Sequence, residues 1–250
     1  MSMGSHFKGV GVLEHLKQAR KKGYLASSEP HGIEAMGHLM GGADAAREVA
    51  IASFLLTILF LNLPISLNLS YSLISLFLSG LFFWKVGRSA SLGWSRLERI
   101  NKLIEDEKEE IETNRSEEKE ELTEIYEAKG FSEPLLSKVI DVLMADDNKL
   151  LGIMLEEELG VSLESNEHPL KQALGTAIGF LLASCAIFAS VLLFQLKGIF
   201  ISAFFIIMIA SAYMANIQKI RILHQTVWNL SITFLAGAST YFLCKFFVSL

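Results

Sequence analysis

Glutamate side chains recur at helical spacing in the middle of the chain. Glu107 and Glu110 form one Glu-x-x-Glu pair, and Glu118 and Glu121 form a second pair eleven residues later. Carboxylates three residues apart lie on the same side of a helix. Such oxygen donors bind divalent cations, because the cation neutralises charges that otherwise repel one another. The spacing therefore indicates metal binding, with a solvated acidic helix face as the alternative.

The two pairs would meet only if the helix that carries them is interrupted. Eleven residues are about three helical turns, so a continuous helix places both pairs on one stripe but far apart along its axis. The segment 113–116, Thr-Asn-Arg-Ser, favours a break, since Asn and Ser are typical of turns and helix caps. We expect Ser116 to cap a new helix that starts at Glu117. Folding back here would bring the four carboxylates together.

A thioether occurs farther along the same acidic stretch. Met154 and Glu158 are four residues apart, which places them on one face of a predicted helix. A sulfur ligand shifts the preference of a site toward softer transition metals. The stretch 91–168 holds all of these residues and 22 of the chain's 27 acidic residues. We expect it to form a separate helical domain with a modest core.

Apolar blocks flank this acidic stretch on both sides. The chain has 250 residues, 51% of them hydrophobic, and a mean hydropathy of +0.40, which is typical of a polytopic membrane protein. Roughly 20 apolar residues in a helix cross a bilayer core. Five segments are predicted to do so, at residues 48–67, 71–87, 173–196, 198–217 and 227–247.

Charge placement predicts the orientation of these spans. The stretch 62–70 between the first two spans is uncharged, whereas Lys219 and Arg221 follow the fourth span and the N-terminal region is basic. The positive-inside rule then places the N-terminus and the acidic domain in the cytoplasm. A bacterial inner membrane is the simplest location. The predicted domains are residues 1–43 as a cytoplasmic N-terminal region with an amphipathic helix at 12–22, 44–90 as spans one and two, 91–168 as the acidic domain, and 169–250 as spans three to five.

Ionisable residues also occur at the edge of the predicted spans. Asp44 precedes the first long apolar run, and an ionisable residue at such a depth is a candidate for an ion path. The alternative is that Asp44 is only a helix N-cap. Lys85 and Arg88, at the end of span two, are expected to extend to the cytoplasmic interface. His38 is interpreted as incidental.

Small residues predict close helix packing in two places. Gly80, Gly87 and Gly93 lie in or just after span two, and residues 236–239 in span five read Ala-Gly-Ala-Ser. The chain contains no P-loop, His-Glu-x-x-His motif, nucleophile triad or basic nucleic-acid patch. We therefore expect neither an enzyme of the usual kinds nor a nucleic-acid partner.

The order of motifs from Glu107 to Pro169 resembles that of the vacuolar iron transporter family. The resemblance includes both Glu-x-x-Glu pairs, the run Glu-Ile-Tyr-Glu-Ala-Lys-Gly-Phe at 124–131, the run Met-Leu-Glu-Glu-Glu-Leu-Gly at 154–160, and the proline before span three. It implies an all-α membrane protein, a homodimer with five transmembrane helices and a cytoplasmic three-helix metal-binding domain inserted between spans two and three.

The resemblance also implies a function and a set of site residues. Family members export Fe²⁺ and similar ions from the cytosol in exchange for protons, so Fe²⁺, Mn²⁺ and Zn²⁺ are the expected ions. The family aspartate of span one aligns with Asp44. A second methionine, frequent in the family after Met154, is Leu155 here. The implied metal ligands are Glu107, Glu110, Glu118, Glu121, Met154 and Glu158.

The predicted spans depart from the family pattern at positions that matter for transport. Leu76 and Trp84 align with a glutamate and a methionine that face the family's pore, and residues 184–187 replace a proline-rich motif in span three. Two hypotheses follow: a proton-coupled divalent metal transporter, or a membrane-anchored metal-binding or sensor protein that has lost its pore ligands. A ferritin-like oxidase is a third reading, but it lacks the Glu-x-x-His signature.

Overall fold

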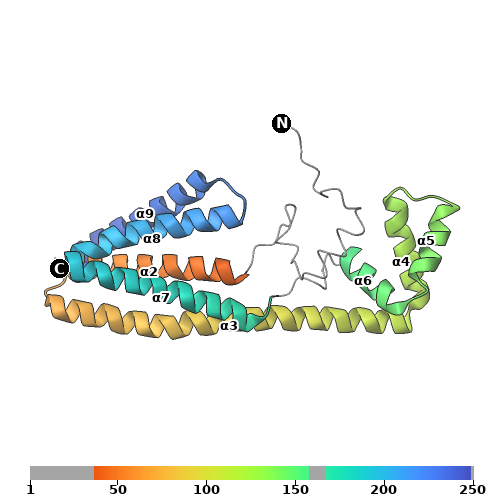
Figure 1. Cartoon of the computed structure of the whole chain (residues 1–250), viewed down its shortest axis with the longest axis horizontal. Coiled ribbons are helices and arrows are strands. Elements are labelled where there is room, and N and C mark those ends of the chain that lie inside the picture. The colour runs from red at the N-terminus through yellow and green to blue at the C-terminus, as the bar shows by residue number, and fades with distance from the viewer. Residues whose placement is uncertain (1–36, 158–166, 249–250) are drawn as a thin grey trace, which may run out of the picture. The chain divides into compact units, whose positions relative to one another are not determined.

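The computed structural model of the chain describes residues 37–157 and 167–248, and their regular structure is helical (Figure 1). The predicted amphipathic helix at 12–22 and the predicted ligand Glu158 lie outside this range. The helices are α2 (Gly37–Leu61), α3 (Leu67–Thr113), α4 (Arg115–Ala128), α5 (Leu135–Leu143), α6 (Asp147–Glu157), α7 (Pro169–Phe194), α8 (Leu196–Ile217) and α9 (Ile222–Val248).

The chain forms two compact units. The first, which we call the membrane unit, combines Met1–Gly93 with Glu167–Leu250. The second, the acidic unit, is Trp94–Asn166. The helix α3 contributes to both, because it runs without interruption from Leu67 to Thr113. The second predicted span therefore continues as one helix into the acidic unit.

Four of the five predicted spans fall on helices that are long and apolar enough to cross a membrane, namely α3, α7, α8 and α9. The first predicted span falls on α2 and the turn after it. This helix is 25 residues long, but it carries Asp44, Arg47 and Glu48 in its first half. A fifth span at α2 remains a prediction. Because α2 begins at Gly37, Asp44 lies inside the helix, and the interpretation of Asp44 as an N-cap is wrong.

Glycines allow α2 and α7 to touch through their backbones. A Cβ atom on Gly179 would collide with the carbonyl oxygen of Gly42, and one on Gly175 would collide with the carbonyl oxygen of His38. Small residues at such a spacing are the usual means of close packing between membrane helices. The sequence carries this signal as Gly-x-x-x-Gly at 175–179, a different set of glycines from those predicted to pack.

The predicted packing glycines differ in what surrounds them. A Cβ atom on Gly93 would lie 2.9 Å from the Cα atom of Pro169, so the helices approach closely there. Gly237 of α9 packs against the ring of Phe54 in the same chain. A Cβ atom on Gly80 or Gly87 would have no neighbouring atom within 4 Å among the described residues. Only some of the small residues in the predicted spans therefore serve helix contact inside one chain.

The first half of α3 is attached to the membrane unit through side chains. The rings of Phe82 and Phe180 meet edge to face, with centroids 5.3 Å apart. Thr176 Oγ1 donates a hydrogen bond of 2.9 Å to Ser89 Oγ, which joins α7 to α3. The buried core of this region contains residues of α2, α3, α7 and α8, namely Ala45, Val49, Ile74, Phe180, Ala183, Ile187, Leu196 and Ile199.

The acidic unit contains the predicted break. The helix α3 ends at Thr113 and α4 begins at Arg115, so Asn114 occupies the cap position that was predicted for Ser116. The helix α4 ends at Ala128, and the nearby Gly130 has a φ of 95°, a left-handed conformation suited to glycine after a helix end. At α6, Asp146 Oδ1 accepts the backbone N–H groups of Asn148 and Lys149, so Asp146 caps this helix.

A histidine and a glutamate join the beginnings of α2 and α7. Glu167 accepts the backbone N–H of His38 at 2.8 Å and contacts the His38 ring, and Lys171 Nζ lies 3.2 Å from the carboxylate. His38 is therefore not incidental to the fold. Burial raises the pKa of Glu167, but the hydrogen bonds from the His38 backbone, Lys171 and the His38 ring lower it by more, so the pKa lies below its ordinary 4.5.

We predict that Gly179→Ala destabilises the membrane unit by about 1–3 kcal/mol, because the added methyl group separates α2 from α7. The matched control is Gly80→Ala, which places a methyl group in open space and should be neutral or stabilise by up to about 1 kcal/mol. Unfolding of the purified variants in detergent measures both. Equal stability of the two variants would contradict close contact at Gly179.

We predict that Glu167→Gln destabilises the fold at neutral pH by about 1–2 kcal/mol, since it weakens hydrogen bonds made by a charged group. A carboxyl with a lowered folded pKa stabilises the fold above its unfolded pKa, and the stabilisation is lost as the pH falls through the folded value. The difference in unfolding midpoint between wild type and variant should therefore shrink below about pH 4.5. Glu112→Gln, at an exposed position, is the control, and a difference independent of pH would refute this account.

Candidate functional site

The predicted metal ligands lie on three helices of the acidic unit. Glu107 and Glu110 are on α3, Glu118 and Glu121 are on α4, and Met154 is on α6. The predicted ligand Glu158 follows the last described residue of α6. Helices from both sides of the break at Asn114 therefore supply the carboxylates, and a third helix supplies the sulfur.

One glutamate of each pair is buried. Glu107 and Glu118 are each 4% exposed, whereas Glu110 and Glu121 are exposed. The cause is helical spacing, because Glu107 precedes Ile111 by one turn and Glu118 precedes Leu122 by one turn.

Ile111 and Leu122 are both buried in the core of the acidic unit, which also contains Met154. The two glutamates therefore lie on the helix faces that enter this core. The buried core residues are Ile111, Leu122, Leu136, Ile140, Leu150 and Met154.

Ion pairs hold α4 in place against α5 and α6. Arg115 donates to Asp147 Oδ1 at 2.7 Å and to the carbonyl oxygen of Met144 at 2.7 Å. Lys119 lies 3.1 Å from Asp141 Oδ1 on α5, and Lys129 contacts Glu157 on α6. Each exposed pair contributes little by itself. Together they join the segment that carries Glu118 to α5 and α6.

The described residues contain no group of three or more His, Cys, Asp or Glu side chains arranged to hold a metal ion. The four carboxylates of the two pairs thus do not form a cage within the described part of the acidic unit. Leu155, which stands where the family often has a second methionine, is buried beside Met154. The six-residue ligand set remains a prediction.

A second group of charged residues lies in the membrane unit. Asp44 Oδ1 accepts a hydrogen bond of 2.7 Å from Arg47 Nη2, and Asp44 Oδ2 lies 3.6 Å from Lys85 Nζ. Lys85 also donates to Glu48 Oε1. The expectation that Lys85 extends to the membrane interface is therefore wrong, since its ammonium turns inward to α2. We call Asp44, Arg47, Glu48 and Lys85 the charged cluster.

The two residues that the family resemblance aligns with pore ligands are both on the surface of this chain. Leu76 and Trp84 are exposed on α3, next to Phe77 and Phe83, which are also exposed. Neither leucine nor tryptophan offers an oxygen or sulfur donor to a metal ion. These positions therefore present an apolar face where the family resemblance predicts coordination.

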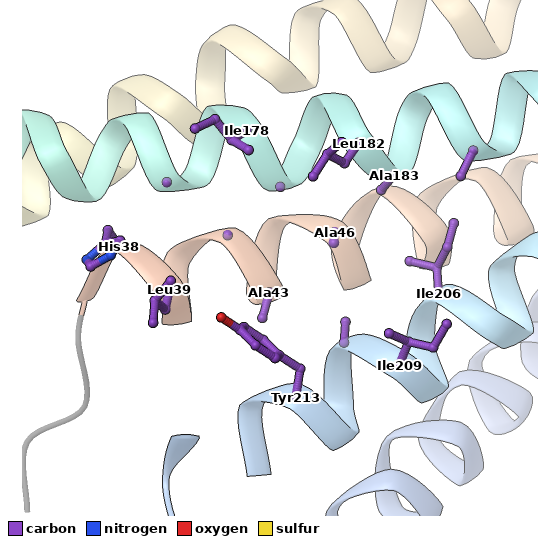
Figure 2. Close-up of a pocket in the computed structure, with 15 residues that line it drawn as sticks. His38, Leu39, Ala43, Ala46, Ile178, Leu182, Ala183, Ile206, Ile209 and Tyr213 are labelled. Carbon is purple, nitrogen blue, oxygen red and sulfur yellow. The ribbon is translucent and has the colours of Figure 1, made fainter. Parts of the chain in front are cut away.

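An apolar groove of about 480 Å³ lies between α2, α7 and α8. Figure 2 shows Tyr213 of α8 opposite Leu39 and Ala43 of α2, with His38 at the beginning of α2. Glycines and alanines from the contact of α2 with α7 form much of the wall. The described lining contains no carboxylate, so the groove has no ligand set for a metal ion.

A search of curated proteins found no match to this chain. A model of the VIT family matches residues 93–245. The matched region contains the end of α3, the whole acidic unit from α4 to α6, and α7 and α8 with most of α9. The charged cluster lies before it. Since the match covers more than half of the sequence, the chain belongs to the VIT family.

Proposed function

We propose that the protein transports divalent metal ions, Fe²⁺ or Mn²⁺ with Zn²⁺ as a further substrate, from the cytosol across the membrane by proton antiport. Membership of the VIT family and the apolar helices support a membrane metal ion transporter. The observation that carries the proposal is the burial of Glu107 and Glu118 on the helix faces that enter the core with Met154.

Burial of two glutamates favours a role in cation binding. Carboxylates are rarely this inaccessible in proteins. Carboxylate oxygens are donors that divalent cations bind. The sulfur of Met154 on the neighbouring helix would favour Fe²⁺, Mn²⁺ or Zn²⁺ over Mg²⁺ and Ca²⁺. We propose that Glu107, Glu118 and Met154 form the centre of the site, with Glu110, Glu121 and Glu158 at its rim.

The route across the membrane would begin at the charged cluster. Asp44 and Glu48 are the only two acidic residues in the described helices of the membrane unit. Carboxylates bind either a proton or a metal ion, which suits exchange of one for the other. We therefore propose that Asp44 lies on the transport path.

The proposed assembly is a homodimer in a bacterial inner membrane. The homodimer is what the family resemblance implies, and the exposed apolar face of α3 suits contact with either lipid or a second copy. Lys219 and Arg221, in the turn between α8 and α9, support a cytoplasmic location for that turn. The N-terminus and the acidic unit would then also be cytoplasmic.

A second candidate function is a membrane-anchored metal-binding or sensor protein that no longer transports. It is favoured by Leu76 and Trp84, which cannot coordinate a metal ion at the positions of the family's pore ligands. Flux of Fe²⁺ and Mn²⁺ into proteoliposomes, with and without a pH gradient, separates the two. Flux that depends on the gradient supports the antiporter, and tight binding without flux supports the sensor.

We predict that Glu118→Gln lowers the affinity of the purified protein for Mn²⁺ by roughly tenfold or more, about 1.4 kcal/mol. Glu121→Gln, in the same pair but exposed, should reduce it less. Titration calorimetry measures both. If the two variants bind alike, burial does not distinguish the ligands, and if both match wild type, the pairs are solvated helix faces.

We predict that Asp44→Ala abolishes metal flux and leaves metal binding by the acidic unit unchanged, because the two groups of residues belong to different units. Proteoliposome flux and calorimetry on the same preparation test this. Glu29→Ala, outside the described helices, is the control for flux. Normal flux in Asp44→Ala would remove this aspartate from the mechanism.

A further inference from the structure

Lys85 is a buried lysine in a helix predicted to cross the membrane. It is 8% exposed, and it follows a stretch from Val49 to Trp84 that contains no charged residue. Lysine is almost never this buried unless its ammonium is paired. Lysines near the end of a span usually turn outward to the membrane surface. The inward orientation of Lys85 therefore reflects what its ammonium contacts.

The ammonium contacts two carboxylates on the neighbouring helix. Asp44 and Glu48 are one turn apart on α2, which places them on the same face. Lys85 Nζ donates to Glu48 Oε1 and lies 3.6 Å from Asp44 Oδ2. Two carboxylates of one helix thus converge on a single positive charge, in the way that they would converge on a bound cation.

The charges of this cluster balance. The second oxygen of Asp44 accepts from Arg47, so two cationic and two anionic side chains face one another. Such a balance leaves no net charge on the cluster to attract another cation. A divalent ion could bind Asp44 and Glu48 only by displacing the Lys85 ammonium.

The carboxylates are more accessible than the lysine. The side chains of Asp44 and Glu48 are 45% and 39% exposed, although Lys85 is buried. The carboxylates are therefore partly accessible to ions while the ammonium is buried. An ion pair that served only to stabilise the fold would be stronger if its carboxylates were as buried as the lysine, because exposed ion pairs contribute little to stability.

We propose that Lys85 is a built-in cation that occupies the Asp44–Glu48 carboxylate pair and excludes divalent metal ions from it. Once the ammonium is removed, the same pair binds a divalent ion. Lys85 thereby limits how often the proposed route is occupied by metal. The inference rests on the proposed transport function only for that last consequence, since occupancy of the pair can be measured without transport.

The test is Mn²⁺ binding to the full-length protein in detergent, measured by equilibrium dialysis at neutral pH. Lys85→Met removes the charge and keeps a long side chain, and we expect it to bind one more Mn²⁺ per chain than wild type. Adding Asp44→Asn and Glu48→Gln to that variant should remove the extra ion.

Lys85→Arg, which keeps the charge, should bind as many Mn²⁺ ions as wild type does. The matched control is Lys245→Met, at an exposed lysine of α9, which should also leave the number of bound ions unchanged. Equal binding by wild type and Lys85→Met overturns the proposal.

A second measurement applies even if Lys85→Met fails to fold. In the wild-type background, Asp44→Asn with Glu48→Gln should leave the number of bound Mn²⁺ ions unchanged, because Lys85 already occupies the pair. Loss of one ion would show that the pair binds metal beside the lysine, and would overturn the proposal. Absence of flux in the wild-type protein would count against the transport function alone, since neither binding result depends on flux.

Discussion

The contact between the backbones of α2 and α7 is the constraint on which the membrane unit depends. Gly42 and Gly179 leave no room for a side chain between the two helices, and their small size lets the backbones touch. In this packing Val49 and Ala50 are buried, and Asp44 and Glu48 lie beside Lys85. The position of the ionisable side chains thus follows from residues that carry no functional group.

The acidic unit differs from the membrane unit in that two carboxylates are buried next to its small core. One glutamate of each pair lies a turn before a core residue, and the other is in water. Lys119 of α4 and Lys129, which follows α4, meet acidic residues of α5 and α6 and reduce the repulsion among helices of like charge. The buried glutamates are therefore held in a unit whose surface charges are partly compensated.

Much of the helical order could be predicted from the sequence, because it depends on local signals. The break near Asn114, the stop at Gly130 and the start of α7 at Pro169 each follow from the preferences of single residues. The partners of Lys85 and His38 could not be predicted in the same way. Their contacts join helices far apart in the sequence, and helical spacing within one segment says nothing about which neighbour a side chain meets.

The charged cluster also bears on how the chain enters a membrane. A lone lysine or aspartate in the apolar region of a bilayer costs several kcal/mol. Arg47 offsets Asp44 within α2, but Glu48 on α2 and Lys85 on α3 compensate each other only when both helices are side by side. If α2 crosses the membrane as predicted, each helix inserted alone would expose one uncompensated charge to lipid. Biogenesis should therefore deliver α2 and α3 together, as a hairpin folded about the short turn between Leu61 and Leu67, before the remaining helices assemble around it.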